Sequence, residues 1–143
     1  MDKNEYYLKQ LSIFSENKSG RFAAISKILK DNNINIHAFS IAEANNNFGI
    51  VRTIVDKPDV AFNAFTKQNY ALQYTKVIGI KLKDEPGDLY RIFQIITELG
   101  INIEYGYTLG MNILIIKVSD LEDAVSKLLS QNLDLIPASQ YNS

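Results

Sequence analysis

Apolar residues fall along the chain in short runs and in helically spaced stripes, and the two alternate. An apolar run at residues 11–15, bounded by polar turn residues, predicts a strand. A loop that contains a glycine follows, and apolar residues then recur three and four positions apart, which predicts a helix with one buried stripe. The stripe consists of Phe22, Ile25, Ile28 and Leu29.

The pattern continues with more strands and a second helix. Three further strands are predicted, at residues 34–41, 48–55 and 71–75. The first two are close enough in the chain to form a hairpin. Asp56 is a candidate N-cap for the helix that follows, whose apolar residues are Ala61, Phe62 and Phe65. The predicted order is βαββαβ.

The same order of predicted strands and helices occurs a second time in the chain. Gly87 lies 67 positions after Gly20, and at this offset the first strands, loops and helices of the two copies align without a gap. Asn33 and Gly100 both lie just past the first helix of their copy, and both residue types tolerate the left-handed conformation that ends a helix. The second helical stripe is Leu89, Ile92, Ile96 and Leu99, and the other predicted segments are strands at 77–82, 101–109, 113–118 and 133–136.

Beyond the second strand the offset between the copies changes. Asp56 aligns with Asp120 at an offset of 64, so we expect three extra residues in the first copy, around residues 44–47, where a turn is predicted. A further shift of one position pairs residues 68–69 with residues 131–132, which are Gln-Asn in both copies. Asp120 is accordingly the second candidate N-cap.

Two copies of this order predict an α+β protein made of two ferredoxin-like βαββαβ domains in tandem. The expected domains are residues 1–75 and 76–143. Only a residue or two near Lys76 separates them, which is too short for a flexible linker. We therefore expect the two domains to pack as a fixed, pseudo-two-fold pair.

Composition narrows the classes of function. Fifteen Lys and Arg residues against sixteen Asp and Glu residues give a net charge of -1, so no positive field favours nucleic acid or an anionic membrane. The absence of cysteine excludes disulfides and thiolate sites and fits a reducing compartment. The N-terminus is too polar for a signal peptide, and no apolar run approaches the roughly 20 residues of a membrane span. We expect a cytoplasmic protein.

Catalytic chemistry is not favoured by the residues present. His37 is the single histidine, and it has no Asp, Glu or second His at metal-ligand spacing. A catalytic base would also need a nucleophile and an orienting partner, and neither is recognisable near it. We therefore expect no enzymatic activity, no catalytic residue, no metal site and no cofactor.

The loops between the first strand and the first helix of each copy are candidate ligand sites. A glycine that opens a helix allows the backbone to approach a ligand, and the positive end of the helix suits a carboxylate. Asn17 in the first loop, or Asp84 in the second, adds an oxygen that can accept from an ammonium group. Together these groups match both charges of a free amino acid. The alternative is that Ser19, Pro86 and the glycines only shape a tight turn.

Two asparagines support the ligand interpretation. Asn35 and Asn102 each lie between two isoleucines at the start of a strand, where asparagine is disfavoured. A local preference that is broken at the same place in both copies invites a functional explanation. Duplication of an asparagine with a structural role would give the same pattern.

These residues resemble the signature of the ACT domain, which combines a Glu-Asn-x-Pro-Gly loop with a Val-Asn-Ile strand start. Residues 16–20 are Glu-Asn-Lys-Ser-Gly, and residues 34–36 are Ile-Asn-Ile. In the second copy, residues 84–87 are Asp-Glu-Pro-Gly and residues 101–103 are Ile-Asn-Ile. The resemblance covers nearly the whole chain as two copies.

The resemblance implies a regulatory module that binds an amino acid at the interface between paired domains. In the related serine-inhibited phosphoglycerate dehydrogenases, the loop Asn of one domain and the strand Asn of its partner are implied to hold one ligand. Carried over, Asn17 would share a site with Asn102, and Asp84 would share a site with Asn35. The candidate ligand-binding residues are Asn17, Lys18, Ser19, Gly20, Arg21, Phe22, Asn35, Ile36, Asp84, Glu85, Pro86, Gly87, Asp88, Leu89, Asn102 and Ile103.

The chain departs from the family pattern at two positions. A family histidine is replaced by Ser15, and the first loop has Ser19 where the family has proline. Both changes leave the identity of the ligand open. An ionised Asp84 repels a ligand carboxylate, so we expect the site of Asn17 and Asn102 to be the better occupied of the two.

Stand-alone tandem ACT proteins are similar to this chain in having no attached enzyme. The expected function is therefore non-catalytic regulation through a bound amino acid, with a homodimer or an amino-acid biosynthetic enzyme as candidate protein partners. An alternative is a regulatory or structural subunit of such an enzyme, for example in an acetolactate-synthase-like system. RNA-recognition motifs share the βαββαβ order, but they need base-stacking aromatic residues on the central strands, and residues 112–116 contain none.

Overall fold

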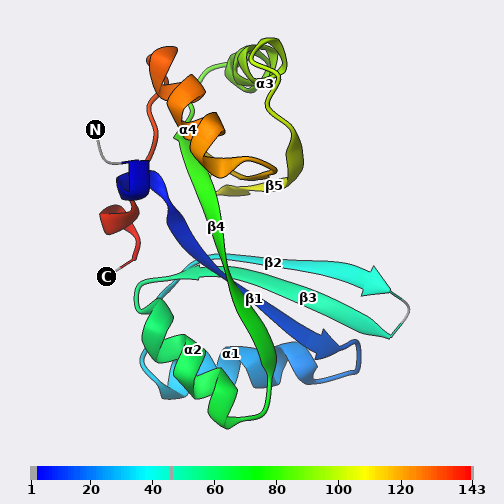
Figure 1. The fold of residues 1–143 in the computed structure, drawn as a ribbon. Coiled ribbons are helices and arrows are strands. Elements are labelled where there is room, and N and C mark those ends of the chain that lie inside the picture. The colour runs from blue at the N-terminus through cyan, green and yellow to red at the C-terminus, as the bar shows by residue number, and fades with distance from the viewer. Residues whose placement is uncertain (1–2, 46, 143) are drawn as a thin grey trace. The chain divides into compact units, whose positions relative to one another are not determined.

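The computed structural model describes residues 3–45 and 47–142 and contains alternating strands and helices (Figure 1). Asn46, in the turn where extra residues were expected, lies outside the described residues. The elements are η1 Lys3–Tyr6, β1 Leu8–Glu16, α1 Arg21–Asp31, β2 Ile36–Asn45, β3 Phe48–Val55, α2 Pro58–Lys67, β4 Ala71–Lys81, α3 Asp88–Glu98, β5 Ile103–Leu109, β6 Ile113–Val118, α4 Leu121–Ser130 and η2 Ala138–Gln140.

Contacts divide the chain into two compact units. We call the one made mainly of Lys9–Thr75 the N-terminal unit, and it also includes the described residues from Tyr141 onward. The C-terminal unit consists of Lys76–Gln140 together with the described residues up to Leu8. The domain bounds expected from the sequence, 1–75 and 76–143, remain a prediction.

The N-terminal unit is an antiparallel sheet with two helices on one face. Its strand order is β2-β3-β1, with the first residues of β4 beyond β1. Figure 1 shows α1 and α2 together against this sheet. Leu11 pairs with Thr53 and Ile13 with Val51, so alternate residues of these strands share one face. The fully buried core residues are Leu11, Ile13, Ile25, Leu29, Val51, Val55, Ala61 and Phe65.

The C-terminal unit repeats this arrangement. Its strand order is β4-β6-β5, and Ile78 pairs with Ile116 while Ile80 pairs with Leu114. Helices α3 and α4 supply their buried stripes to the same core, and Tyr6 and Tyr7 pack against it. The expected α+β, ferredoxin-like architecture in two copies is confirmed.

Two of the predicted strands are one. Residues 71–75 and 77–82 were expected as separate strands, but β4 runs without interruption from Ala71 to Lys81. The residues at the junction, Tyr74, Thr75 and Val77, favour extended backbone, and no glycine or proline interrupts them.

The last predicted strand, residues 133–136, is reduced to a single bridge. Leu135 bridges to Ile80, and the N–H of Ile136 donates to the carbonyl of Gly79 at 2.8 Å. Pro137 follows directly and has no N–H to donate, so the ladder cannot extend.

All four α-helices end in the same way. Asn33 and Gly100 adopt the expected left-handed conformation, with φ of 55° and 71°, and Asn69 and Asn132 do so as well, with φ of 65° and 58°. After α2, the N–H of Tyr70 donates to the carbonyl of Phe65, as in a Schellman motif. The repeated Gln-Asn pair is therefore a helix-ending signal.

The two candidate N-caps have different outcomes. Asp120 caps α4 by accepting from the N–H of Asp123 at 3.1 Å, as predicted. The prediction for Asp56 is wrong, because the N-cap of α2 is Lys57 and Pro58 occupies the first turn. Asp56 instead accepts from the N–H of Asn35 at 2.9 Å.

This result corrects the alignment of the copies. Ile36 pairs with Val55, and Ile103 pairs with Val118, so the residue after the third strand is Asp56 in one unit and Ser119 in the other. The offset from this strand onward is 63 rather than 64. The first copy therefore has four extra residues, not three, and all of them precede the end of β3.

The buried aromatic ring of Phe65 supplies a test of the N-terminal core. Phe65 is fully buried, whereas Phe48 in β3 is 45% exposed. We expect Phe65→Ala to lower the free energy of unfolding in urea by about 3–5 kcal/mol, because it removes apolar contacts and leaves a cavity. The matched variant Phe48→Ala should lose less than about 1 kcal/mol. Equal losses in the two variants would contradict the assignment of the core.

Candidate functional site

Both strand-to-helix loops end in a glycine with left-handed backbone. Gly20 is the N-cap of α1 with φ of 85°, and Gly87 is the N-cap of α3 with φ of 89°. A Cβ atom at either position would meet no atom within 4 Å, so the backbone angle and not the space selects glycine. Neither helix start has a side-chain cap. The N–H of Arg21 donates to the carbonyl of Lys18 and that of Asp88 to the carbonyl of Glu85, so the N–H groups of the next two residues of each helix are left for solvent or a ligand.

The loop before α1 contains an internal ion cluster. The carboxylate of Glu16 lies 2.9 Å from the amine of Lys18 and 3.6 Å from the guanidinium of Arg21. The hydrogen bond and charge of Lys18, with a smaller contribution from Arg21, lower the pKa of Glu16. Asn17 and Ser19 are exposed beside this cluster.

The loop before α3 has the opposite arrangement of charges. Lys83 stands at the position of Glu16, and Asp88 stands at the position of Arg21. Asp88 is only 4% exposed, and its two oxygens accept from the backbone N–H of Lys83 and from Nε of Arg91, both at 2.7 Å. The hydrogen bond from Arg91, followed by that from Lys83, lowers the pKa of Asp88. Asp88 thus serves as an internal anchor for the loop.

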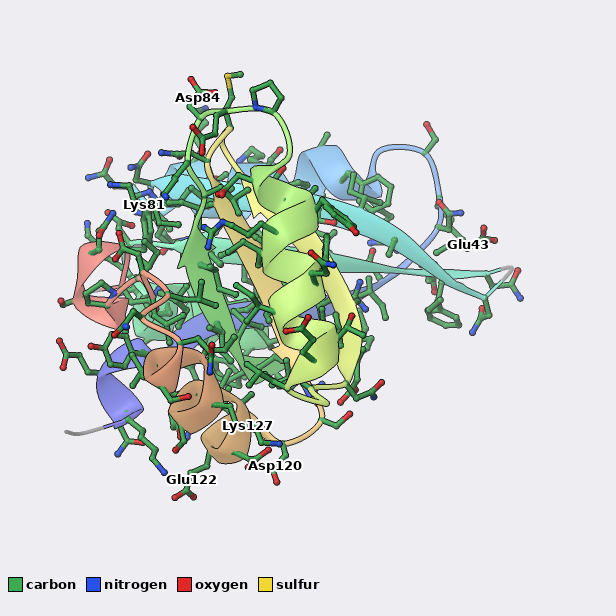
Figure 2. The ribbon with its side chains drawn as sticks, turned by 90° about the horizontal axis from the view of Figure 1, so that it is seen from above. Glu43, Lys81, Asp84, Asp120, Glu122 and Lys127 are labelled. Carbon is green, nitrogen blue, oxygen red and sulfur yellow. The ribbon has the colours of Figure 1, made fainter. Side chains whose placement is uncertain are left out.

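Other candidate residues in this loop face solvent. Asp84, Glu85 and Pro86 are exposed, and Figure 2 shows Asp84 in the loop that precedes α3. Leu89, in the first turn of α3, is 43% exposed.

The two strand-start asparagines make equivalent backbone contacts. The carbonyl of Asn35 accepts from the N–H of Asp56, and that of Asn102 accepts from the N–H of Ser119, both at 3.1 Å. Nδ2 of Asn102 also donates to Oγ of Ser119 at 2.8 Å. The shared contacts use the backbone, which any residue would supply, and of the two asparagines Asn102 has the side-chain contact given above. A structural role of the side chain is therefore shown for Asn102, which the duplicated pattern alone could not separate from a ligand role.

The expected sites each combine residues of both units. Asn17 and Asn35 lie in the N-terminal unit, and Asp84 and Asn102 lie in the C-terminal unit. Each proposed pair, Asn17 with Asn102 and Asp84 with Asn35, therefore stays a prediction. Within the units, Phe22 packs against the core, Ile103 is half-buried, and Ile36 is 38% exposed.

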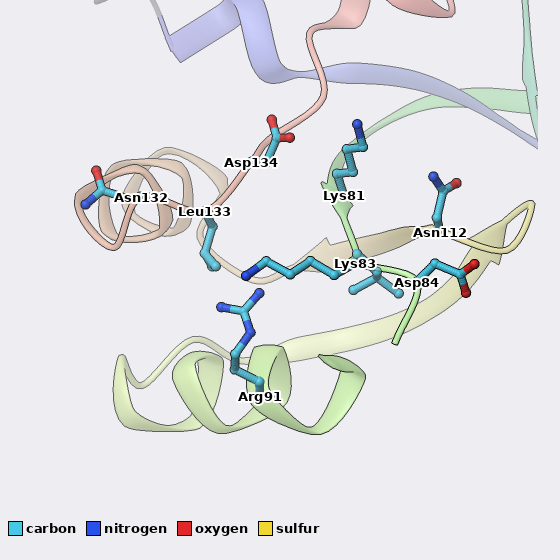
Figure 3. Close-up of a pocket in the computed structure, with 9 residues that line it drawn as sticks. Lys81, Lys83, Asp84, Arg91, Asn112, Asn132, Leu133 and Asp134 are labelled. Carbon is cyan, nitrogen blue, oxygen red and sulfur yellow. The ribbon is translucent and has the colours of Figure 1, made fainter. Parts of the chain in front are cut away.

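A pocket of about 400 Å³ in the C-terminal unit was not anticipated from the sequence (Figure 3). It lies where the end of β4, the helix α3 and the segment after α4 meet. Its lining residues are Lys81, Leu82, Lys83, Asp84, Arg91, Asn112, Asn132, Leu133 and Asp134.

The N-terminal unit has a smaller pocket of about 280 Å³ at the equivalent place. With the corrected offsets, Phe14 stands for Lys81 and Glu16 for Lys83, while Tyr70 stands for Leu133. The aligned sequences already show that Lys81 and Lys83 are replaced by an uncharged and an acidic residue in the first copy, but only the structure shows that these positions line a cavity.

Neither a metal-binding group of side chains nor a helix able to cross a membrane is found in the described part of the chain. Among residues 3–45 and 47–142, no group of three or more His, Asp or Glu side chains is placed to hold a metal ion. Within the same residues, no helix is long and apolar enough to cross a membrane.

The anchor formed by Asp88 generates a prediction about pH. Because the pKa of Asp88 is lower in the folded chain, the unfolded chain takes up the proton first as pH falls. The stability that the carboxylate contributes is therefore complete well above about pH 4 and is lost as pH falls through the folded-state pKa. We expect Asp88→Asn to be less stable than the wild type in urea at neutral pH, and we expect this difference to shrink in acid.

The matched control is Asp84→Asn, in the same loop. Its side chain makes no hydrogen bond to the part of the chain that the structure describes, so this variant should have wild-type stability in urea at neutral pH. A difference between Asp88→Asn and wild type that stays constant down to about pH 2 would contradict the anchor.

Comparison with known proteins agrees with the fold. Residues 6–142 match the family described as an ACT domain pair, and no curated protein matches. A crystal structure of a protein from Bacteroides thetaiotaomicron is 37% identical, with a TM-score of 0.89 over 95% of this chain and 96% of that chain.

Two more distant structures share the fold. The ligand-free regulatory subunit of aspartate kinase from Thermus thermophilus is 18% identical, with a TM-score of 0.59 over 89% of this chain and 93% of that chain. The regulatory subunit of aspartate kinase from Thermus flavus is 17% identical, with a TM-score of 0.55 over 87% and 92% of the two chains. The motifs, the duplicated fold and the match over nearly the whole sequence agree, and the chain belongs to the ACT domain pair family.

Proposed function

We propose that this protein is a non-catalytic regulatory module that binds a free amino acid. The observation that carries the proposal is the pair of uncapped helix starts, each opened by a left-handed glycine. Membership of the ACT domain pair family supports it. Backbone N–H groups at such a helix start, together with the helix dipole, suit the carboxylate of an amino acid.

The side chains of the first loop supply the second half of the recognition. Asn17 is exposed next to the start of α1, and its Oδ1 can accept from the ligand ammonium group. We assign Asn102 to the same ligand, as the resemblance implies, with its amide oxygen as a further acceptor. Nδ2 of Asn102 already donates to Ser119, which would orient that oxygen.

Charge favours the α1 start over the α3 start. Lys18 and Arg21 both approach Glu16, so the three side chains together carry one positive charge. The α3 start is preceded by the exposed carboxylates of Asp84 and Glu85. These groups repel a ligand carboxylate, which supports the site of Asn17 and Asn102 as the one with the higher affinity.

Regulation would follow from differential affinity. A ligand shifts a conformational or assembly equilibrium only to the extent that it binds one state better than the other. The absence of enzymatic activity is part of the proposal. It is supported by the composition, with one histidine and no cysteine. It is also supported by the packing of His37, whose ring lies edge-on to that of Tyr141 with 5.1 Å between the ring centroids.

The first test is a thermal-shift screen with the twenty amino acids. A ligand that binds only the folded chain stabilises it by about 2.7 kcal/mol at one hundred times its Kd, so the melting temperature should rise for one amino acid or a few similar ones. If none of the twenty raises it, the proposal of amino-acid binding fails.

The second test locates the site by calorimetry with the amino acid found in the screen. We expect Asn17→Ala and Asn102→Ala each to weaken binding by roughly ten- to a hundredfold, because each loses a hydrogen bond to a charged group, worth about 1.5–3 kcal/mol. The control is Asn63→Ala, an exposed asparagine on α2. If Asn17→Ala or Asn102→Ala binds the amino acid with unchanged affinity, the substituted residue is not part of the site.

A second candidate function is that of a regulatory subunit of an amino-acid biosynthetic enzyme. It is supported by the likeness in fold to the regulatory subunit of aspartate kinase from Thermus thermophilus. This role is compatible with amino-acid binding. Copurification of the tagged chain from its native cell with a biosynthetic enzyme would support it, and recovery of the chain alone would favour an independent module.

A further inference from the structure

The pocket of the C-terminal unit gathers three cationic side chains from two elements. Lys81 ends β4, Lys83 follows it, and Arg91 lies on α3. Figure 3 shows the amine of Lys83 and the guanidinium of Arg91 directed toward the same part of the pocket, beside Leu133. Like charges that converge in this way repel each other unless an anion lies between them.

The cations are only partly neutralised by the protein. Arg91 donates from Nε to Asp88 at 2.7 Å, and its side chain remains 45% exposed. Within the described residues, neither Lys81 nor Lys83 forms an ion pair or donates a side-chain hydrogen bond. Asp88 therefore fixes the position of Arg91 through its Nε. The two outer nitrogens of the guanidinium and the amine of Lys83 remain able to bind an oxyanion.

The equivalent pocket of the N-terminal unit shows that the fold does not need these cations. Phe14 and Glu16 line it at the places of Lys81 and Lys83, and the residue aligned with Arg91 is Ala24, outside the lining. The cation in its lining, Arg21, stands at the place of Asp88 and lies 3.6 Å from the carboxylate of Glu16. A structural requirement would be expected in both copies. The three cations are instead specific to one copy, which points to a ligand.

The other lining groups define the rest of the ligand. Asp84 and Asn112 lie together at the opposite end of the pocket from Lys83 and Arg91 (Figure 3). Carboxylate and amide oxygens accept hydrogen bonds, and a second anionic group near them would be repelled. The pocket thus has an oxyanion end at Lys83 and Arg91 and an end for hydrogen-bond donors at Asp84 and Asn112. The carboxylate of Asp134, after α4, is a further acceptor in the lining. Its volume of about 400 Å³ is in the range of small-molecule sites.

We propose that this pocket binds a small hydroxylated metabolite with one oxyanion head group, either a carboxylate or a phosphate. The head group lies between Lys83 and Arg91, and the hydroxyl groups point toward Asp84 and Asn112. This site goes beyond the proposed amino-acid function. It lies within one unit and does not use Asn17 or Asn102, although it shares Asp84 with the second predicted amino-acid site, that of Asp84 and Asn35.

The test uses three probes that share a three-carbon skeleton. Glycerate carries the carboxylate, glycerol 3-phosphate carries the phosphate, and glycerol carries neither. Each is titrated into the full isotope-labelled chain at constant ionic strength, and backbone amide signals are followed by NMR. We expect saturable shifts at residues 81–84, 112 and 132–134 with at least one of the two anions and not with glycerol. The anion that binds more tightly identifies the head group.

Variants separate the pocket from general attraction to positive charge. Lys83→Gln should weaken binding of the anion by roughly tenfold or more, because it removes one of the two charged donors. Lys127→Gln, on α4 outside the pocket (Figure 2), changes the net charge equally and should leave affinity unchanged. Asn17→Ala should also have no effect, since it belongs to the amino-acid site.

Three results would overturn the proposal. The first is the absence of saturable shifts with both anions up to about 10 mM. The second is an equal response to glycerol, which would mean that the head group is not recognised. The third is an affinity that Lys83→Gln does not change, or that Lys127→Gln changes as much.

Discussion

Each unit can bury an apolar face only where two helices lie on one side of its antiparallel strands. Leu11 and Ile13 meet Ile25, Leu29 and Phe65 in one core, and the equivalent residues meet in the other. This burial fixes where the first strand must stop and the first helix must begin. The glycine-opened loop is the connection that satisfies both, so the position of the candidate ligand site follows from the packing of the core.

Much of the fold could be predicted because hydrophobic spacing and helix-ending residues are local signals. The stripes of α1 and α3, the left-handed residues Asn33 and Gly100, and the repeat itself needed no tertiary information. The N-cap at Asp56 was wrong because aspartate is also suited to bind a backbone N–H across a hairpin, as it does with Asn35. The division of β4 into two strands was wrong although the local signals favoured one strand, because the expected boundary between the two copies was placed at Lys76.

The candidate sites, like the fold, could be predicted from the sequence only in part. Sequence pattern located the glycine-opened loops, because left-handed backbone and uncapped helix starts follow from residue type. The pattern could not show that the side chain of Asp88 is buried and accepts hydrogen bonds from Lys83 and Arg91, since an aspartate at the first position of a helix is commonly exposed to solvent. The cationic pocket was missed because its lining residues are far apart in the sequence and meet only after folding.

The inverted charges of the two loops bear on how a duplicated chain folds correctly. Tandem copies that are alike can misassemble during folding by exchanging equivalent segments. If the first strand of one copy docked with the first helix of the other, Glu16 would approach Asp88, or Lys83 would approach Arg21. Both wrong combinations place like charges together. In the native chain Glu16 lies 3.6 Å from Arg21, and the pKa of Asp88 is lowered mainly by Arg91, with a smaller contribution from the positive charge of Lys83. The charge inversion therefore disfavours a swapped chain, while both halves keep the same order of strands and helices.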